Sequence, residues 1–290
     1  MNDISQKPSG NRHLVVVSNR LPFIMQKDNG QWKLVAGSGG LVSALAPVLR
    51  NRGGMWIGWP GSAESEAIDL QAVLANATKN AGYTLKAVML TPEEKDKFYH
   101  GFSNEVIWPL FHDLQSHCNF DSSYWSVYQQ VNQKFAHVIS ENCKRDDFIW
   151  VHDYHLMNVA KEMHAIGTTS KMAFFLHIPF PPLDIFVKLP WRFQLLQAIL
   201  EYDLIGFQTL RDRRNFMQCI RTLLPDALIL GKGQVLTVRL GEREVRLGAF
   251  PIGIDFNDFA KKAATEEVEL SALRLRQDLP KRHVIESINS

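Results

Sequence analysis

The sequence contains few cysteines and no long apolar run. Its 290 residues include three cysteines, Cys118, Cys143 and Cys219. They lie far apart and form no CxxC pair, so the sequence predicts reduced thiols rather than a disulfide framework or a cysteine-based metal site. No run of about 18 apolar residues occurs, so no membrane-spanning helix is expected. Residues 1–12 are polar and lack the apolar segment of a signal peptide, so we expect a disordered tail on a cytoplasmic protein.

Neither sign of charge is in large excess, and no internal repeat or low-complexity segment is found. Lys and Arg number 32, Asp and Glu number 30, and the net charge is +2. This balance gives no indication of a nucleic-acid-binding surface or of an acidic partner. Hydrophobic residues make up 46% of the sequence. That fraction is ordinary for a globular protein, and the length suggests one large domain or two small ones.

The clearest pattern runs from Asp147 to Pro182. Two near-continuous apolar runs, 148–151 and 172–176, flank a helical stripe over 156–166 that Gly167 ends. A strand, a helix and a second strand in this order form a βαβ unit, so we expect two parallel strands that are buried on both faces.

Polar residues follow both of these strands. Asp153 comes after the first and His177 directly follows the second. Because parallel strands end at the same edge of a sheet, both side chains should face one crevice. In open α/β folds this edge is where ligands bind.

Apolar runs alternate with helical patterns along the rest of the chain. This alternation predicts an α/β fold with a doubly wound, mainly parallel, Rossmann-like sheet. We expect a disordered tail over 1–12, one domain over 13–255, and a linker helix with the first strand of a second domain over 256–290. The expected strands are 13–18, 55–59, 83–90, 204–207 and 283–288, and hairpins should join 23–25 to 32–35 and 234–238 to 244–249. The expected helices are 41–50, 70–80, 91–102, 123–142, 183–201 with a break at Pro190, 211–223 and 266–279. An aromatic loop is expected at 108–112.

Two features at the start of the chain are suited to an anion. Gly39 and Gly40 open a helix, where free backbone N–H groups and the helix dipole favour negative charge. Arg20 directly follows the first strand and could bind a phosphate with two hydrogen bonds. Each feature also has a simpler interpretation, a tight strand-to-helix turn for the glycines and an ordinary surface position for the arginine.

The histidines around Asp153 admit three interpretations. His152, Asp153, His155 and His177 could form a metal-ligand set, although neighbouring residues of a strand point to opposite sides. They could instead form a network that braces the turn. In the third interpretation Asp153 hydrogen-bonds sugar hydroxyls and His177 faces a reacting centre.

Aromatic and basic residues near predicted loop ends are open to similar alternatives. Trp59, Tyr99 and Trp108 could hold a sugar against an aromatic face, although most aromatic side chains belong to the core. Arg211, Arg213 and Arg214 form a basic cluster interrupted by Asp212. The nearly neutral net charge favours a solvated helix face for this cluster.

Taken together, the motifs resemble those of the trehalose-6-phosphate synthase family. That family comprises retaining glycosyltransferases that move glucose from UDP-glucose to glucose 6-phosphate. The resemblance extends in order from His13 to Asp255. Its motifs are VVVSNRLP, GSGGLVSAL, WIGWPG, FYHGFSNEVIWPLFH, WVHDYHLM, FFLHIPFPPLDIFVKLPWR, YDLIGFQT and FPIGID.

The resemblance implies roles for individual residues in a two-domain GT-B architecture, of which this chain would be the acceptor-binding domain. Catalysis would involve His177 and Asp153, and no metal or cofactor would be required. Matched by motif, the acceptor phosphate would be bound by Arg20 and Tyr99, and the acceptor sugar would be lined by Trp59, Trp108 and Asp153. The donor diphosphate would meet Gly39 and Gly40, and the donor glucose would lie against His177.

The resemblance also implies a second domain that carries the donor-binding cations and the acidic donor motif. Residues 283–290 align with the opening of its first strand and end where an arginine is expected. Three hypotheses stay open: the acceptor half of a trehalose-6-phosphate synthase, a relative such as glucosylglycerol-phosphate synthase, or a non-catalytic sugar-phosphate-binding module. The expected partners are the small-molecule substrates, with no nucleic acid and no membrane. A homo-oligomer or a complementing donor-domain chain is also open.

Overall fold

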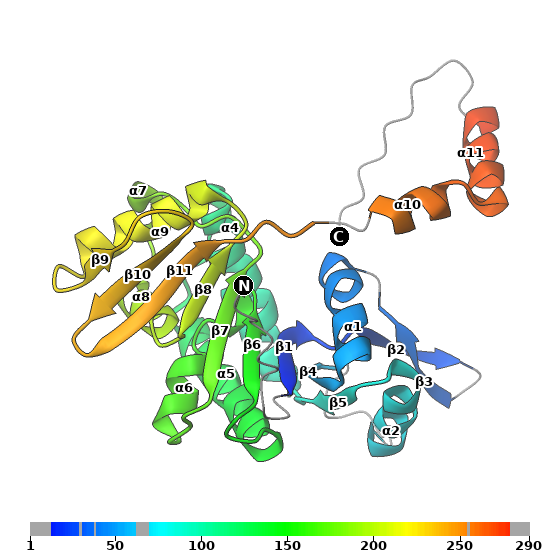
Figure 1. Ribbon diagram of the computed structural model, residues 1–290, viewed down its shortest axis with the longest axis horizontal. Helices are drawn as coiled ribbons and strands as arrows, with labels where there is room; N and C mark the ends of the chain where they lie inside the picture. The colour runs from blue at the N-terminus through cyan, green and yellow to red at the C-terminus, as the bar shows by residue number, and fades with distance from the viewer. Residues whose placement is uncertain (1–12, 29–30, 38, 62–69, 254–255, 279–290) are drawn as a thin grey trace, which may run out of the picture.

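The structure is a computed structural model that describes residues 13–28, 31–37, 39–61, 70–253 and 256–278. Its centre is a nine-stranded sheet with the order β5-β4-β1-β6-β7-β8-β11-β10-β9 (Figure 1). Neighbouring strands are parallel from β5 to β11, and β10 pairs antiparallel with both β11 and β9. The strands are β1 Leu14–Arg20, β4 Gly54–Trp59, β5 Thr84–Ala87, β6 Phe148–His152, β7 Lys171–Leu176, β8 Leu204–Phe207, β9 Leu228–Leu230, β10 Val235–Leu240 and β11 Arg243–Ala249. The predicted α/β fold with a mainly parallel sheet is confirmed.

Two apolar cores lie on opposite faces of this sheet. In β1, Val15 and Val17 belong to one core and Val16 to the other, as the two-residue period of a strand requires. The larger core is covered by α5 Ser122–Asn142, α6 Val159–Ala165, α7 Leu183–Phe186, α8 Arg192–Ile199 and α9 Leu210–Leu223. The smaller core is covered by α1 Gly40–Arg52 and α2 Leu70–Ala81, which lie over β1, β4 and β5.

Both predicted hairpins are present. The first is a separate two-stranded sheet of β2 Phe23–Asp28 and β3 Gln31–Ala36, and the second is the β10–β11 pair. The helices expected at 70–80, 123–142, 211–223 and 266–279 are confirmed, the last as α11 Glu266–Asp278, and the expected break at Pro190 separates α7 from α8. The polar tail at 1–12 and the strand at 283–288 lie outside the described residues.

The region after Thr91 differs from the prediction. Thr91 and Glu94 form the expected capping box at the start of α3 Pro92–Glu94. A π-helix, η1 Lys95–Ile107, then leads directly into α4 Trp108–Phe111. The expected loop at 108–112 was therefore wrong. Proline is tolerated in the first turn of a helix, and Leu110 and Phe111 are buried in the larger core.

Smaller differences concern lengths and short elements. The helix expected from 156 begins at Val159, because a 3₁₀ turn, η3 Tyr154–Leu156, comes first. The strand β9 and the helix α10 Phe256–Ala263 were not predicted. Among the described helices, none is both long and apolar enough to cross a bilayer.

Candidate active site

Arg20 lies on an aromatic platform at the carboxyl end of β1. Its guanidinium carbon is 4.2 Å from the centre of the Trp59 ring and 5.4 Å from that of Tyr99. Trp59 ends the neighbouring strand β4 in register with Arg20, and its carbonyl accepts the Leu21 N–H at 2.9 Å. A guanidinium stacked on rings in this way can still hydrogen-bond an anion through its edges.

A glycine makes room for this arginine. Gly61 has a positive φ of 95°, and a Cβ at this position would lie 2.5 Å from the Arg20 Nη1 atom. The Trp59-Pro60-Gly61 sequence therefore supplies both the ring under the guanidinium and the space beside it.

The Tyr99 ring packs against the His155 ring. Their rings stack with centres 5.7 Å apart and an angle of 12°, and Tyr154 packs on His155 at 4.0 Å. Burial, together with the nearby Arg20 charge, lowers the pKa of His155 to about 3. His155 is therefore a neutral ring in the layer beneath Tyr99, which agrees with the bracing interpretation.

Asp153 occupies a backbone conformation that is rare for a residue other than glycine. Its φ is 73°, and its own N–H donates to the Phe175 carbonyl on the next strand at 2.8 Å. Aspartate tolerates this region better than most residues. The Asp153 carboxylate accepts the His177 backbone N–H at 3.3 Å. Burial raises the pKa of Asp153 to about 6, and the backbone N–H groups of Tyr154, His177 and Ile178 act in the opposite direction.

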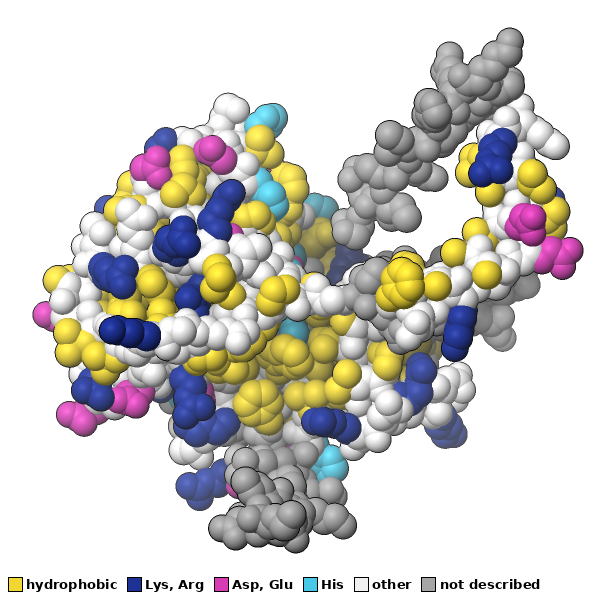
Figure 2. Space-filling model, turned by 45° about the horizontal axis from the view of Figure 1, so that its top comes forward, with side chains coloured by type: hydrophobic (Ala, Val, Ile, Leu, Met, Phe, Trp, Pro, Cys, Tyr) yellow, Lys and Arg dark blue, Asp and Glu magenta, His cyan; other side chains and the backbone are white. Residues whose placement is uncertain are grey.

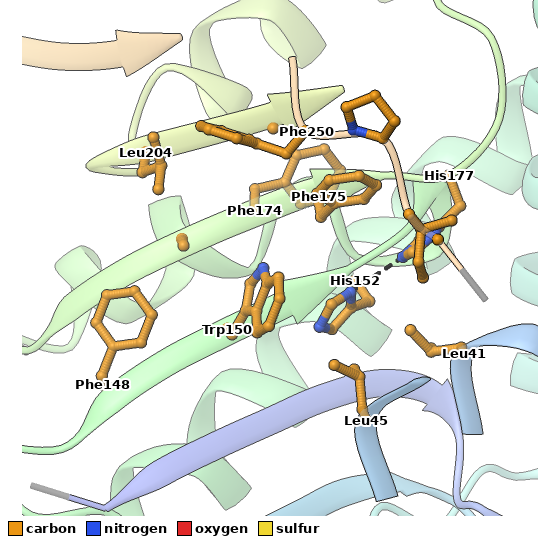
Figure 3. A pocket seen from close by; sticks show the side chains of 15 residues that line it. Leu41, Leu45, Phe148, Trp150, His152, Phe174, Phe175, His177, Leu204 and Phe250 are labelled. Atoms are coloured by element: carbon orange, nitrogen blue, oxygen red, sulfur yellow. Dashed lines mark hydrogen bonds between the residues drawn. The ribbon is translucent and has the colours of Figure 1, made fainter. Parts of the chain in front are cut away.

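The His177 imidazole turns toward the sheet rather than toward Asp153. Its Nε2 atom lies 3.0 Å from the Nδ1 atom of His152, on the neighbouring strand (Figure 3). Burial lowers the pKa of His177 to about 4 and places that of His152 well below its usual value. Both rings are thus neutral near pH 7.

The start of α1 lies close to His177. Among the described residues, no side chain caps this helix at Gly39, and a Cβ at Gly39 or Gly40 would meet no described atom within 4 Å. Leu41, in the first turn, lines the same cavity as His177. The two glycines therefore have open space around them beside the histidine.

This cavity is an apolar trough of about 530 Å³ on the face of β6, β7 and β8 that α1 and α2 leave uncovered. Figure 2 shows the apolar side chains gathered in the middle of this face. Phe250 closes one side, because Gly248 in β11 has no side chain: a Cβ there would lie 2.2 Å from the Phe250 ring. The trough is lined mainly by Leu41, Leu45, Phe148, Trp150, Phe175 and Phe250 (Figure 3). His152 and His177 lie at the end of the trough where the strands β6 and β7 have their carboxyl ends.

The structure brings most of the sequence-predicted residues together at one edge. Arg20, Trp59 and Tyr99 form one contact group, and Asp153 and His177 form a second. The stacked rings of His155 and Tyr154 join the groups, since Tyr154 directly follows Asp153.

Trp59 lies differently from expectation, and Trp108 makes no ring contact with the Arg20 platform among the described residues. The Trp59 side chain has no exposed surface, so in this conformation its ring supports Arg20 and cannot contact a sugar directly. Trp108 is 40% exposed and packs on His112, with ring centres 4.3 Å apart. Among the described residues, no ring contact joins Trp108 to Tyr99 or Trp59.

Two polar residues near the site lie where the sequence did not predict them. Gln208 directly follows β8 and contacts His177, so the rule that identified Asp153 and His177 could have found it. Asp212 is buried, not on a solvated face: its carboxylate accepts the Phe180 N–H at 3.2 Å and the Thr209 hydroxyl at 2.6 Å. Within the described residues, no three His, Cys, Asp or Glu side chains are arranged to hold a metal ion.

Comparison with known proteins decides the family. The model of glycosyltransferase family 20 matches residues 12–290. The chain belongs to glycosyltransferase family 20. This family membership accounts for the arrangement of motifs at the sheet edge and makes the protein a transferase by family.

Family members of known sequence and structure are similar over nearly the whole chain. A trehalose-6-phosphate synthase of Mycolicibacterium gilvum is 37% identical over 279 residues, which are 94% of this chain and 55% of the relative. A Burkholderia xenovorans synthase solved with glucose-6-phosphate has a TM-score of 0.78 at 30% identity, covering 93% of this chain and 56% of its own. An E. coli protein bound with UDP-2-fluoro glucose has a TM-score of 0.74 at 32% identity, and the match covers 92% of this chain and 54% of the E. coli chain. The chain thus spans about half the length of these relatives.

Proposed function

We propose that the chain is the acceptor-binding half of a retaining glycosyltransferase that transfers glucose from UDP-glucose to glucose 6-phosphate and forms trehalose 6-phosphate. The observation that carries this proposal is the Arg20 guanidinium stacked on Trp59 and Tyr99, at the same sheet edge as Asp153 and His177. Relatives named as synthases of this product support it.

In this proposal the acceptor phosphate binds the exposed edge of Arg20. The aromatic platform holds the guanidinium in place, so less side-chain freedom is lost when the phosphate binds. Tyr99 lies beside the phosphate, and Asp153 and Trp108 line the acceptor sugar. Trp59 acts through Arg20, because its ring is buried.

The donor binds between Gly39, Gly40 and His177. The free N–H groups at the start of α1 face the donor diphosphate, and His177 lies against the donor glucose. The protein orients both substrates, and the departing phosphate takes the acceptor proton, so Asp153 and His177 position groups rather than form a covalent intermediate. UDP-glucose is a co-substrate here, and the proposal assigns no metal or resident cofactor.

The proposal includes a donor-binding domain as partner, which corresponds to the remaining length of the relatives. Such a domain would supply the cations that neutralise the UDP diphosphate. We also propose a cytoplasmic location, because Cys118, Cys143 and Cys219 are all free thiols.

The test is calorimetric titration of the 290-residue chain with glucose 6-phosphate, with glucose and inorganic phosphate as controls. We expect weak binding of glucose 6-phosphate that exceeds that of either control, because phosphate and sugar occupy adjoining sites. A parallel assay with UDP-glucose should yield no product from the chain alone and should yield trehalose 6-phosphate once the second half of a relative is added. Equal binding of inorganic phosphate and glucose 6-phosphate would reject the acceptor assignment.

A further inference from the structure

Four hydrogen-bonding groups form a chain that passes through the His177 ring and ends on His152. It begins at the Ile252 backbone N–H, which donates to Gln208 Oε1 at 3.0 Å. Gln208 Nε2 faces His177 Nδ1 at 3.5 Å, and His177 Nε2 faces His152 Nδ1 at 3.0 Å. The chain therefore crosses from the segment after β11 to β8, β7 and β6.

The orientation of the Gln208 amide follows from the first member of this chain. A backbone N–H can only donate, so the Gln208 atom that faces Ile252 must be the carbonyl oxygen. The other end of the Gln208 amide is then the NH₂ group, which also can only donate. A donor that faces His177 Nδ1 favours a lone pair rather than a proton on that atom.

The same reasoning extends to the two histidines. Each ring is neutral and carries one proton, since burial lowers the pKa of both. With Nδ1 of His177 unprotonated, its proton lies on Nε2 and is donated to His152 Nδ1. The proton of His152 then lies on its own Nε2 atom, which is buried and has no hydrogen-bond partner among the described residues.

We propose that Gln208 and His152 are positioning residues that hold the His177 imidazole in one orientation with its proton on Nε2. The tautomer follows from these hydrogen bonds and from the neutral state of both rings, and only the consequence for glucose transfer rests on the proposed function. The 3.5 Å contact to Gln208 is longer than the usual range, so Nδ1 is available as an acceptor for a ligand hydroxyl. His177 thereby presents an acceptor toward the donor sugar.

The test reads the tautomer directly by nitrogen NMR of the full chain carrying labelled histidine. The His177 signals are those lost in His177→Gln. We expect a neutral ring protonated at Nε2. Gln208→Glu replaces the amide donor with an acceptor and should reverse the relay, moving the His177 proton to Nδ1. A His177 proton on Nδ1 in the native chain, or no change in Gln208→Glu, would overturn the proposal.

A matched pair of variants tests His152. Asn places a carbonyl oxygen close to the position of Nδ1, whereas Leu fills a similar volume without an acceptor. His152→Asn should keep the Nε2–H form of His177, and His152→Leu should give a mixture of tautomers; the same single form in both variants would remove His152 from the relay. His164, on α6, pairs with Glu201 after α8 at 2.8 Å, and unchanged His164 signals would show that each variant folds. Failure to bind glucose 6-phosphate would reject the proposed function and leave this result standing.

Discussion

Arg20 combines two properties that usually exclude each other in a surface arginine. Arg20 is an exposed residue, yet the ring faces of Trp59 and Tyr99 limit the rotation of its guanidinium. Most exposed arginines lose rotamer freedom when they bind an anion, and this cost weakens binding. In this protein the Arg20 side chain loses that rotamer freedom during folding, so its guanidinium is already oriented before a phosphate binds.

Arg20→Ala should weaken glucose 6-phosphate binding by about 2–4 kcal/mol, since charge-assisted hydrogen bonds are lost. Arg20→Lys should give an intermediate loss, because lysine keeps the charge but not the planar fork. Calorimetric titration measures both. Arg239→Ala serves as the control, because Arg239 is an exposed arginine paired with Glu244 on the β10–β11 hairpin. Equal effects of Arg20→Ala and Arg239→Ala would remove Arg20 from the phosphate site.

Asp153 should make the stability of the protein depend on pH. Its folded pKa is about 6, above its value of about 3.9 in an unfolded chain. The folded state therefore binds more protons between these values, and its contribution is fully present below pH 4 and lost as the pH rises through 6.

Urea unfolding of the native chain and of Asp153→Asn at several pH values measures this effect. The free energy of unfolding of the native chain should fall, relative to that of the variant, by about 2 kcal/mol between pH 4 and pH 6. If the difference in unfolding free energy between the two proteins stayed constant over this range, the Asp153 carboxylate would be ionised in the folded state at no net cost.

The edge residues show how far sequence reasoning reaches at this scale. Arg20, Asp153 and His177 could be placed together because each follows a predicted parallel strand, and strand direction alone fixes that edge. The side-chain details could not be predicted. Whether Trp59 faces a ligand or lies under Arg20 depends on packing between β1, β4 and η1, which no local pattern records.

Among the elements, α9 shows how a buried carboxylate connects a helix to a loop of the site. Asp212 lies in the first turn of α9 and accepts both the Thr209 hydroxyl and the Phe180 N–H, while Asn215 donates to the Phe180 carbonyl. Phe180 follows His177 by three residues. The orientation of the segment after β7 therefore depends on the start of α9.

Asp212→Ala should reduce the free energy of unfolding by about 2–3 kcal/mol, because it leaves the buried Phe180 N–H without an acceptor. Urea denaturation measures this loss. Asp226→Ala is the matched control, since Asp226 is an exposed aspartate in the turn after the same helix. A loss equal to that of the control would show that Asp212 is not needed to hold the Phe180 segment.

The π-helix and α4 mark the limit of prediction at the scale of elements. The start of this region was predictable, because the Thr91 cap acts through neighbouring backbone atoms. Its continuation was not. Proline at position 109 and the surrounding aromatic residues resemble a loop locally, whereas the long-range packing of Phe111 on Phe180 favours a helix there.

At the scale of the whole molecule, the sheet is covered unevenly. Among the described helices, those over the larger core cover one face along most of its width, whereas α1 and α2 cover the other face over β1, β4 and β5. The trough over β6, β7 and β8 exposes apolar side chains to solvent, among them Phe148, which is 36% exposed. Contiguous apolar surface of this kind binds hydrophobic dyes.

The native chain should therefore enhance the fluorescence of such a dye while fully folded, and Phe148→Gln should reduce this enhancement. Phe148 begins β6, four residues and about 13 Å from His152 at its carboxyl end. Because of this separation, Phe148→Gln should leave the affinity for glucose 6-phosphate unchanged. Dye titration and calorimetry on the same samples measure both quantities. Reduced affinity for glucose 6-phosphate in Phe148→Gln would show that the trough at Phe148 is coupled to phosphate binding at Arg20, contrary to this expectation.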